Sequence, residues 1–302
     1  MLNLCSGRRR DADVQCQLMW TTAHEDYTIM MLSCDIAIDA ILGDLTNRET
    51  VAYWLEQVKV GRVVGAIMGP PCETLSVVRF MLSVGEKLPP PLRSDIKPWG
   101  LDGLTARQYE QLYLSNVLLH VALSFFAVLL GTGGFCLIEH PALPARLRAP
   151  SIWKLSYVEW LLKSPAVTKR TFNQSVHGQM AIKPTTFLLL RLDGIKRYLY
   201  SRQGQYAPLD IVGELHGRGV DGKWNTSRAK EYPPSLCLAI ARAIKDAVDS
   251  SIATVAGAGG TENVGEMFDP VVEFAQFHQQ LDVYDPATAG TAMGADCMLF
   301  NR

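Results

Sequence analysis

The chain contains a thiol and a carboxyl group in contexts that suit catalysis. Cys72 follows Gly-Pro-Pro in "GPPCETLS", directly after a short apolar run. Prolines fix φ and stiffen this turn, and a helix predicted from "VVRFML", with Ser76 as its cap, would favour the thiolate. Cys72 is therefore a candidate nucleophile. The alternative is a small buried side chain.

Glu139 ends the apolar run "FCLIE" and directly precedes His-Pro. A carboxyl group that emerges from a buried strand could hold or donate a proton. A structural carboxylate satisfied by its neighbours is the alternative for Glu139, and the sequence leaves both open.

Three further turns suit a small polar ligand. Ser6 and Gly7 follow the run "MLNLC", where backbone N–H groups could meet a carboxylate or a phosphate. Asp35, in "SCDIAID", could accept hydrogen bonds from ribose hydroxyls, and Asp44, in "GDLTN", could accept one from an adenine amino group. Solvated turns and surface acids are the alternatives at these positions.

Apolar runs that look like buried strands precede each of these turns. They begin at Met1, Tyr27, Val63 and Phe135. Amphipathic helical patterns lie between them, over Val14 to Ala23, Glu49 to Val60, and Leu104 to Leu130. This alternation predicts an α/β fold with a doubly wound, mostly parallel sheet, and it brings the polar residues to the carboxyl ends of the strands. Further patterns predict a helix at 152–163, strands at 167–172 and 186–191, and a last helix at 234–248.

The domain organisation follows from the same patterns. Residues 1–250 form one catalytic-type domain, in which the proline-rich stretch 86–104 is a long loop of the kind that often has a function. Residues 251–302 are acidic and weakly patterned, which predicts a flexible tail. The apolar run Val117 to Leu130 is too short to cross a bilayer, so we expect a buried helix and no membrane partner.

Composition restricts the class of protein. The chain has 302 residues, 48% of them hydrophobic, and a net charge of -1, so any nucleic-acid surface must come from local basic clusters. Seven cysteines without a Cys-x-x-Cys pair predict reduced thiols in an intracellular protein, located in the nucleus if the source is eukaryotic. We expect a monomer that needs no metal.

In this order, the sites resemble those of the cytosine-C5 DNA methyltransferases, over roughly residues 1–248. "LNLCSG" is similar to their first motif, "GPPCETLS" to their Gly-Pro-Pro-Cys-Gln-x-x-Ser motif, and "IEHP" to their Glu-Asn-Val motif. "YPPSLCLAIARAI" is similar to the Pro-Pro-x-Leu segment that opens their last helix. The resemblance implies a Rossmann-like domain that binds S-adenosylmethionine.

The resemblance also assigns roles to residues. Cys72 would add to C6 of a cytosine flipped out of the duplex, and Glu139 would hold the proton on ring N3. Cofactor contacts would come from Ser6, Gly7, Asp35, Asp44 and Pro70. Contacts to DNA would come from Ser76, Arg79, Arg93, Lys183 and Thr185, with the loop after Cys72 as a closing lid in which Lys97 also meets phosphates. A short basic and aromatic segment, 193–226, would be the reduced target-recognition insert.

Departures from the family pattern support two other hypotheses. Glu73 replaces the family's glutamine and puts a negative charge beside Cys72, which disfavours a thiolate unless Glu73 points away or pairs with a cation such as Arg79. The chain could therefore be an inactive methyltransferase-fold module that binds cofactor or nucleic acid. An unrelated thiol hydrolase would need His140 or His177 as a base near Cys72.

Overall fold

A sheet of six strands forms the centre of the part of the chain that the computed structural model describes, namely residues 1–80, 88–144, 149–205, 213–214 and 229–257. These residues belong to one compact unit, Met1–Glu262. The strand order is β2-β1-β3-β4-β7-β5, and β7 runs antiparallel to both of its neighbours. The other five strands share one direction, which confirms an α/β fold with a mostly parallel sheet.

The strands match the predicted apolar runs closely in all but one case. Their bounds are Leu2–Leu4 for β1, Leu32–Cys34 for β2, Gly65–Met68 for β3, Phe135–Pro141 for β4, Val167–Asn173 for β5 and Pro184–Leu190 for β7. The exception is β2, which begins near the end of its predicted run. The reason is register: β1 is three residues long, and Leu2 pairs with Leu32. A separate pair of short strands, β6 (Ala181–Ile182) and β8 (Gly213–Glu214), lies outside this sheet.

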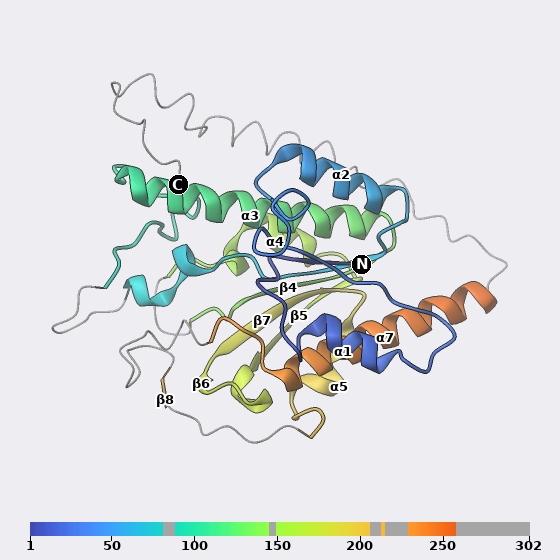
Figure 1. Cartoon of the computed structure of the whole chain (residues 1–302). Coiled ribbons are helices and arrows are strands. Elements are labelled where there is room, and N and C mark those ends of the chain that lie inside the picture. Colours follow the sequence, from blue (N-terminus) through green and yellow to red (C-terminus); the bar gives the residue numbers. More distant parts are fainter. Residues whose placement is uncertain (81–87, 145–148, 206–212, 215–228, 258–302) are drawn as a thin grey trace. The chain divides into compact units, whose positions relative to one another are not determined.

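Helices cover both faces of the sheet (Figure 1). One face carries α2 (Arg48–Lys59), α3 (Ala106–Gly131) and α4 (Ser156–Leu161), and the other carries α1 (Val14–Thr21), α5 (Lys196–Leu199) and α7 (Pro234–Gly257). Successive side chains of β4 alternate between the two hydrophobic clusters, with Cys136 and Ile138 in one and Phe135 and Leu137 in the other. The sheet is thus buried on both sides, which explains its continuous apolar strands.

Capping residues set where the helices begin. The Asn47 side chain accepts from the N–H groups of Glu49 and Thr50 at the start of α2. Thr105 and Gln108 form a capping box at the start of α3. By length and composition α3 could cross a membrane, but 67% of its most apolar window is buried in the core, so it packs as the core helix that the sequence predicted.

Three predicted elements differ from the structure. The helix expected after Cys72 is replaced by two short 3₁₀ turns, η1 (Glu73–Leu75) and η2 (Val77–Phe80), because the Arg79 side chain bonds back to the Glu73 carbonyl. The helix predicted for 152–163 is divided into a 3₁₀ turn, η3 (Ile152–Lys154), and α4. The last helix continues to Gly257 instead of ending at 248.

Two predicted regions lie largely outside the described residues. In the recognition insert, residues 193–205 contain a 3₁₀ turn, η5 (Asp193–Ile195), and α5, and nearly all of the remainder is not described. In the tail, residues 251–257 belong to α7, and 258–302 are not described.

A candidate active site at the carboxyl ends of the strands

The candidate residues gather where the strand order changes direction. From β1 the chain goes to β2 on one side and later to β3 on the other, so the loops after β1 and β3 flank a crevice. In open α/β sheets, ligands bind in this crevice. A cavity of about 1520 Å³ lies there, and it is lined by Ser6, Gly7, Asp35, Asp44, Pro70, Cys72, Ser76, Arg79, Glu139 and Lys183.

Cys72 is half-buried at the start of η1, with its thiol close to several charged groups. Burial, followed by the charges of Glu139 and Glu73, raises the pKa of Cys72 to about 12, whereas Lys183 opposes this shift. The predicted helix dipole is missing, because a three-residue 3₁₀ turn follows in place of an α-helix. Cys72 is therefore a protonated thiol at neutral pH in the free protein.

Antiparallel pairing of β4 with β7 brings Glu139 to Lys183. Pro141 pairs with Thr185, so the start of β7 lies beside the end of β4. Lys183 Nζ lies 3.6 Å from Glu139 Oε1, and both side chains are only 11% exposed. Gln174, fully buried at the start of η4 (Gln174–His177), donates from Nε2 to Glu139 Oε1 over 3.4 Å and to Thr185 Oγ1 over 2.9 Å.

Thr185 and Arg79, which the resemblance places in contact with DNA, make their polar contacts inside the protein. Thr185 is fully buried, and its hydroxyl accepts the Gln174 bond and donates to the Lys183 carbonyl. Arg79 is also buried, and its guanidinium donates to the Glu73 and Pro90 carbonyls and to Gln111 Oε1. This arrangement gives no support to the predictions that Thr185 and Arg79 contact DNA, since their polar groups hold the loops around the cavity.

Arg93 is a clearer correction, because it does not line the cavity at all. It is 1% exposed and donates to Thr74 Oγ1, Ser115 Oγ, Asn116 Oδ1 and the Pro98 carbonyl. Burial, together with the charge of Arg79, lowers the pKa of Arg93 to about 9. Arg93 therefore connects the proline-rich loop to α3 and to the turn after Cys72, and it does not reach a phosphate.

The loops after β1 and β2 hold the predicted cofactor residues. Asp35 accepts from the Gly7 N–H through Oδ2 and from the Ala37 N–H through Oδ1, both over 2.9 Å. Asp44 Oδ1 accepts from the Thr46 N–H and hydroxyl. Gly7 has φ +66°, a conformation that glycine adopts without strain. Both acids are thus fixed by their own loops and line the same cavity.

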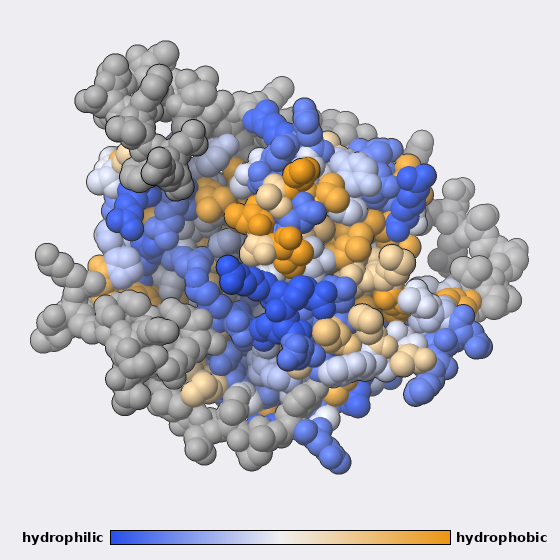
Figure 2. Space-filling model, in the orientation of Figure 1, coloured by the Kyte–Doolittle hydropathy of each residue, from blue (hydrophilic) through white to orange (hydrophobic). Residues whose placement is uncertain are grey.

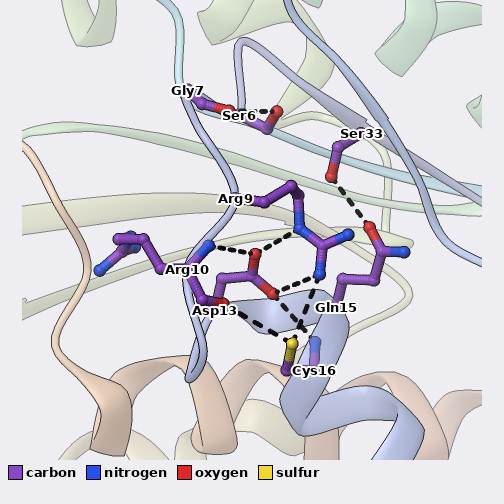
Figure 3. A network of polar contacts seen from close by, with 8 residues as sticks. All are labelled: Ser6, Gly7, Arg9, Arg10, Asp13, Gln15, Cys16 and Ser33. Atoms are coloured by element: carbon purple, nitrogen blue, oxygen red, sulfur yellow. Dashed lines mark hydrogen bonds and ion pairs between the residues drawn. The ribbon is translucent and has the colours of Figure 1, made fainter. Parts of the chain in front are cut away.

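The three arginines after β1 are not equivalent, and Figure 3 draws two of them, Arg9 and Arg10. Arg9 makes two bonds to the Asp13 carboxylate, which in turn caps α1 by accepting the Cys16 N–H. Arg10 pairs with Glu231 at 3.2 Å and donates to the Tyr232 carbonyl. Arg8 is exposed and lines the cavity, so it is the arginine best placed to meet a ligand.

The surface beside this loop combines polar and apolar areas. Figure 2 shows strongly hydrophilic residues across the middle of one face, next to an apolar area. Large exposed apolar side chains occur in the loop between β2 and α2, at Ile36, Ile38, Ile41 and Leu42. Ile36 also lines the cavity, directly after Asp35. This arrangement suits a ligand with hydroxyl groups and a flat apolar ring.

The two histidines proposed as bases for a thiol hydrolase do not line the cavity. His140 is buried beside Trp153, and burial, with the charge of Arg93, lowers its pKa to about 3. His177 bonds to Ser235 and to the Leu199 carbonyl. Neither histidine is in a position to take a proton from Cys72.

Three residues at the site escaped the sequence reasoning. Gln174 contacts Glu139, Lys230 contacts Glu73, and the Tyr232 hydroxyl lies next to Gly69, 3.2 Å from where a Cβ on that glycine would stand. Tyr232 is the first residue of the predicted Tyr-Pro-Pro motif and Lys230 lies two residues before it, so that motif was the available signal. No local pattern marks Gln174.

Comparisons with known proteins identify no relative. A scan against protein-family models gave no match, and a search among curated proteins gave none either. Among the residues that the structure describes, no three His, Cys, Asp or Glu side chains are grouped so as to hold a metal ion.

Proposed function

We propose that this protein transfers a methyl group from S-adenosylmethionine to C5 of cytosine in DNA, through a covalent bond between Cys72 Sγ and C6 of the ring. We also propose that the α/β fold is that of the Rossmann-like methyltransferases. One observation carries it: Cys72 and Glu139 line one cavity with Asp35 and Asp44, at the change in strand order where ligands bind.

The residues at the β1 and β2 ends fit the cofactor. Asp35 would accept from the ribose hydroxyls and Asp44 from the adenine amino group, with Ile36 against the adenine ring. The Ser6–Gly7 turn, Arg8 and Pro70 would hold the amino-acid end. The cavity volume, about 1520 Å³, exceeds the roughly 300–1,000 Å³ of common ligand sites and leaves room for a base as well. When bound, S-adenosylmethionine supplies an electrophilic methyl group.

Cys72 and Glu139 would act on the base as a coupled pair. Cys72 must lose its proton to bond to C6, and the carboxylate charge of Glu139 opposes this by raising the thiol pKa. Glu139 would hold the proton on ring N3, which makes C6 more electrophilic. After methyl transfer, the C5 proton would pass to a base from solvent and Cys72 would leave C6 as the thiolate, which would restore the aromatic ring.

Lys183 and Gln174 would orient Glu139 for this step. Lys183 also lowers the pKa of Cys72, so one cation serves both reacting groups. For the DNA strand, Ser76 and Lys183 remain candidates on the cavity wall, and exposed Arg107 lines the same cavity.

Covalent trapping tests the proposal. The protein is incubated with S-adenosylmethionine and duplex DNA containing 5-fluorocytosine, which cannot release its C5 substituent after methylation. We expect a band that resists denaturation and is lost in Cys72→Ser. A matched RNA duplex, run in parallel, tests the choice of nucleic acid.

An inactive module that binds cofactor or nucleic acid is the second candidate. The Cys72 pKa of about 12 favours it, because almost no thiolate forms at neutral pH in the free protein. Binding of S-adenosylmethionine that is weakened by Asp35→Ala, with no trapping on any DNA, would support this candidate and reject the first.

A further inference from the structure

Glu73, the residue after the proposed nucleophile, forms an ion pair with a distant part of the chain. Lys230 Nζ donates to Glu73 Oε1 over 2.9 Å, although the two residues are 157 positions apart in sequence. Both residues line the cavity that contains Cys72. The side chains are 62% and 45% exposed, so water can reach the pair.

The segment that carries Lys230 is fixed from the opposite side of the crevice. Glu231 pairs with Arg10 at 3.2 Å, and Arg10 also donates to the Tyr232 carbonyl. Gln179 Nε2 donates to the Glu231 carbonyl over 3.2 Å. Residues 230–232 therefore contact both loops: Glu231 and Tyr232 bind Arg10 in the loop after β1, and Lys230 binds Glu73 in the loop after β3. The contacts with Arg10 and Gln179 hold the segment so that Lys230 faces Glu73.

The charges around Cys72 explain why the pair matters. Glu139 of β4, Glu73 of η1 and the Tyr232 hydroxyl are the acidic groups near the thiol. The cations near them are Lys183, Lys230 and Arg79, and of these Lys230 makes the ion pair with the Glu73 carboxylate, whereas Arg79 bonds to the Glu73 carbonyl. Burial raises the pKa of Glu73, but the bond and the charge of Lys230, together with a backbone hydrogen bond and the charge of Arg79, lower it overall, so Glu73 is ionised at neutral pH. Without a neighbouring cation, that charge would act fully on Cys72.

We propose that Lys230 is a positioning residue that offsets the charge of Glu73 and thereby makes ionisation of Cys72 less unfavourable. This inference rests on the proposed function, in which Cys72 is the nucleophile. It also explains how a chain with glutamate directly after the nucleophile could remain active, since the compensating charge arrives from the segment before α7.

Alkylation of Cys72 by iodoacetamide tests this inference without any methylation assay. The rate is followed by mass spectrometry of the peptide that contains Cys72, from pH 7 to pH 10, in four proteins: wild type, Lys230→Gln, Glu73→Gln and the double variant. We expect Lys230→Gln to slow alkylation about two- to fivefold, the range for an exposed ion pair, and to move the pH profile upward. Lys230→Arg should restore the wild-type profile.

The double variant distinguishes charge compensation from a structural role. If Lys230 acts through Glu73, the Lys230→Gln change has little effect once Glu73 is glutamine, and Glu73→Gln alone accelerates alkylation. Equal slowing in both backgrounds, or no slowing in either, overturns the inference. Lys154→Gln is the control, because it removes another exposed 2.9 Å pair, with Asp95, that does not line the cavity.

The outcome is independent of the proposed reaction. Failure of covalent trapping in wild type, combined with the expected alkylation pattern, would reject the methyltransferase and keep the charge compensation. Normal trapping with an unchanged alkylation profile in Lys230→Gln would keep the proposed methyltransferase and reject the charge compensation.

Discussion

Arg93 and Lys183 are both cations with almost no exposure, yet they face opposite surroundings. Arg93 donates to neutral oxygens of Thr74, Ser115, Asn116 and Pro98, and lies outside the cavity. Lys183 lies on the cavity wall, 3.6 Å from the Glu139 carboxylate. The resemblance implied contacts to DNA for both. Their partners show that Arg93 holds the scaffold, whereas Lys183 faces the Glu139 carboxylate, which is one of the two groups proposed to react.

The largest expected effect comes from removing the scaffold cation. Arg93→Met leaves several buried oxygens without a donor, and we expect the free energy of unfolding to fall by about 3 kcal/mol. Urea denaturation followed by tryptophan fluorescence measures it. Arg62→Met is the control, since the exposed Arg62 guanidinium bonds only to the Gln57 side chain, over 3.2 Å, among the contacts described. A loss below about 1 kcal/mol would contradict the scaffold role.

Lys183→Met should damage the chemistry more than the fold. Gln174 still donates to Glu139, so we expect a loss of about 2 kcal/mol in stability. Because Lys183 lowers the pKa of Cys72, we also expect covalent trapping to slow by about tenfold or more, the change that follows from one pKa unit. Lys183→Arg should recover part of the rate. Equal trapping rates for Lys183→Met and wild type would show that Lys183 does not influence the proposed reaction and that it does not differ from Arg93 in this respect.

The charges of Arg93 and Lys183 both act on His140, so the stability of this region depends on pH. Burial, then Arg93, and to a smaller extent Lys183, lower its pKa to about 3 from an ordinary 6.5. The unfolded chain therefore binds a proton that the folded protein excludes. Above about pH 6.5, His140 is neutral in both states and does not reduce the free energy of unfolding. As the pH falls from about 6.5 toward about 3, this residue lowers the free energy of unfolding, with a slope of at most about 1.4 kcal/mol per pH unit. Urea titrations at several pH values should show a shallower slope for His140→Leu; an unchanged slope would count against this assignment.

The smallest expected effect on stability and on trapping is that of a change at Lys97. It is exposed and pairs with Asp102 on the same loop. Such pairs contribute about 0–1 kcal/mol, so Lys97→Ala should change the free energy of unfolding by less than about 0.5 kcal/mol and leave trapping unaffected. A large loss of trapping in this variant would instead restore the proline-rich loop as a phosphate-binding lid.

The sequence predicted the sheet well because local patterns encode it. Continuous apolar strands and capped helices fixed the order of elements, and the rule that ligands bind at the carboxyl ends of strands brought Cys72, Glu139, Asp35 and Asp44 to one cavity. The prediction of a helix after Cys72 was wrong, because the conformation of this segment depends on the bond from the Arg79 side chain to the Pro90 carbonyl, 11 residues away, and on its bond to the Glu73 carbonyl.

Partners from distant segments could not be predicted. Nothing near Arg93 in sequence shows that Ser115 and Asn116 will accept its bonds, and nothing near Glu73 shows that Lys230 will. Gln174 reaches Glu139 only through the antiparallel pairing of β5 and β7 beside β4. Such contacts depend on tertiary packing, which residue types and spacing alone do not specify.

The most direct test of the account is the mass of the peptide containing Cys72 after reaction with S-adenosylmethionine and DNA that contains 5-fluorocytosine. The account predicts that this peptide gains the mass of the methylated fluorocytosine nucleotide after nuclease digestion. It also predicts that Cys72→Ser and Glu139→Gln show no such adduct. An unmodified Cys72 peptide, or an adduct on any other cysteine, would contradict it.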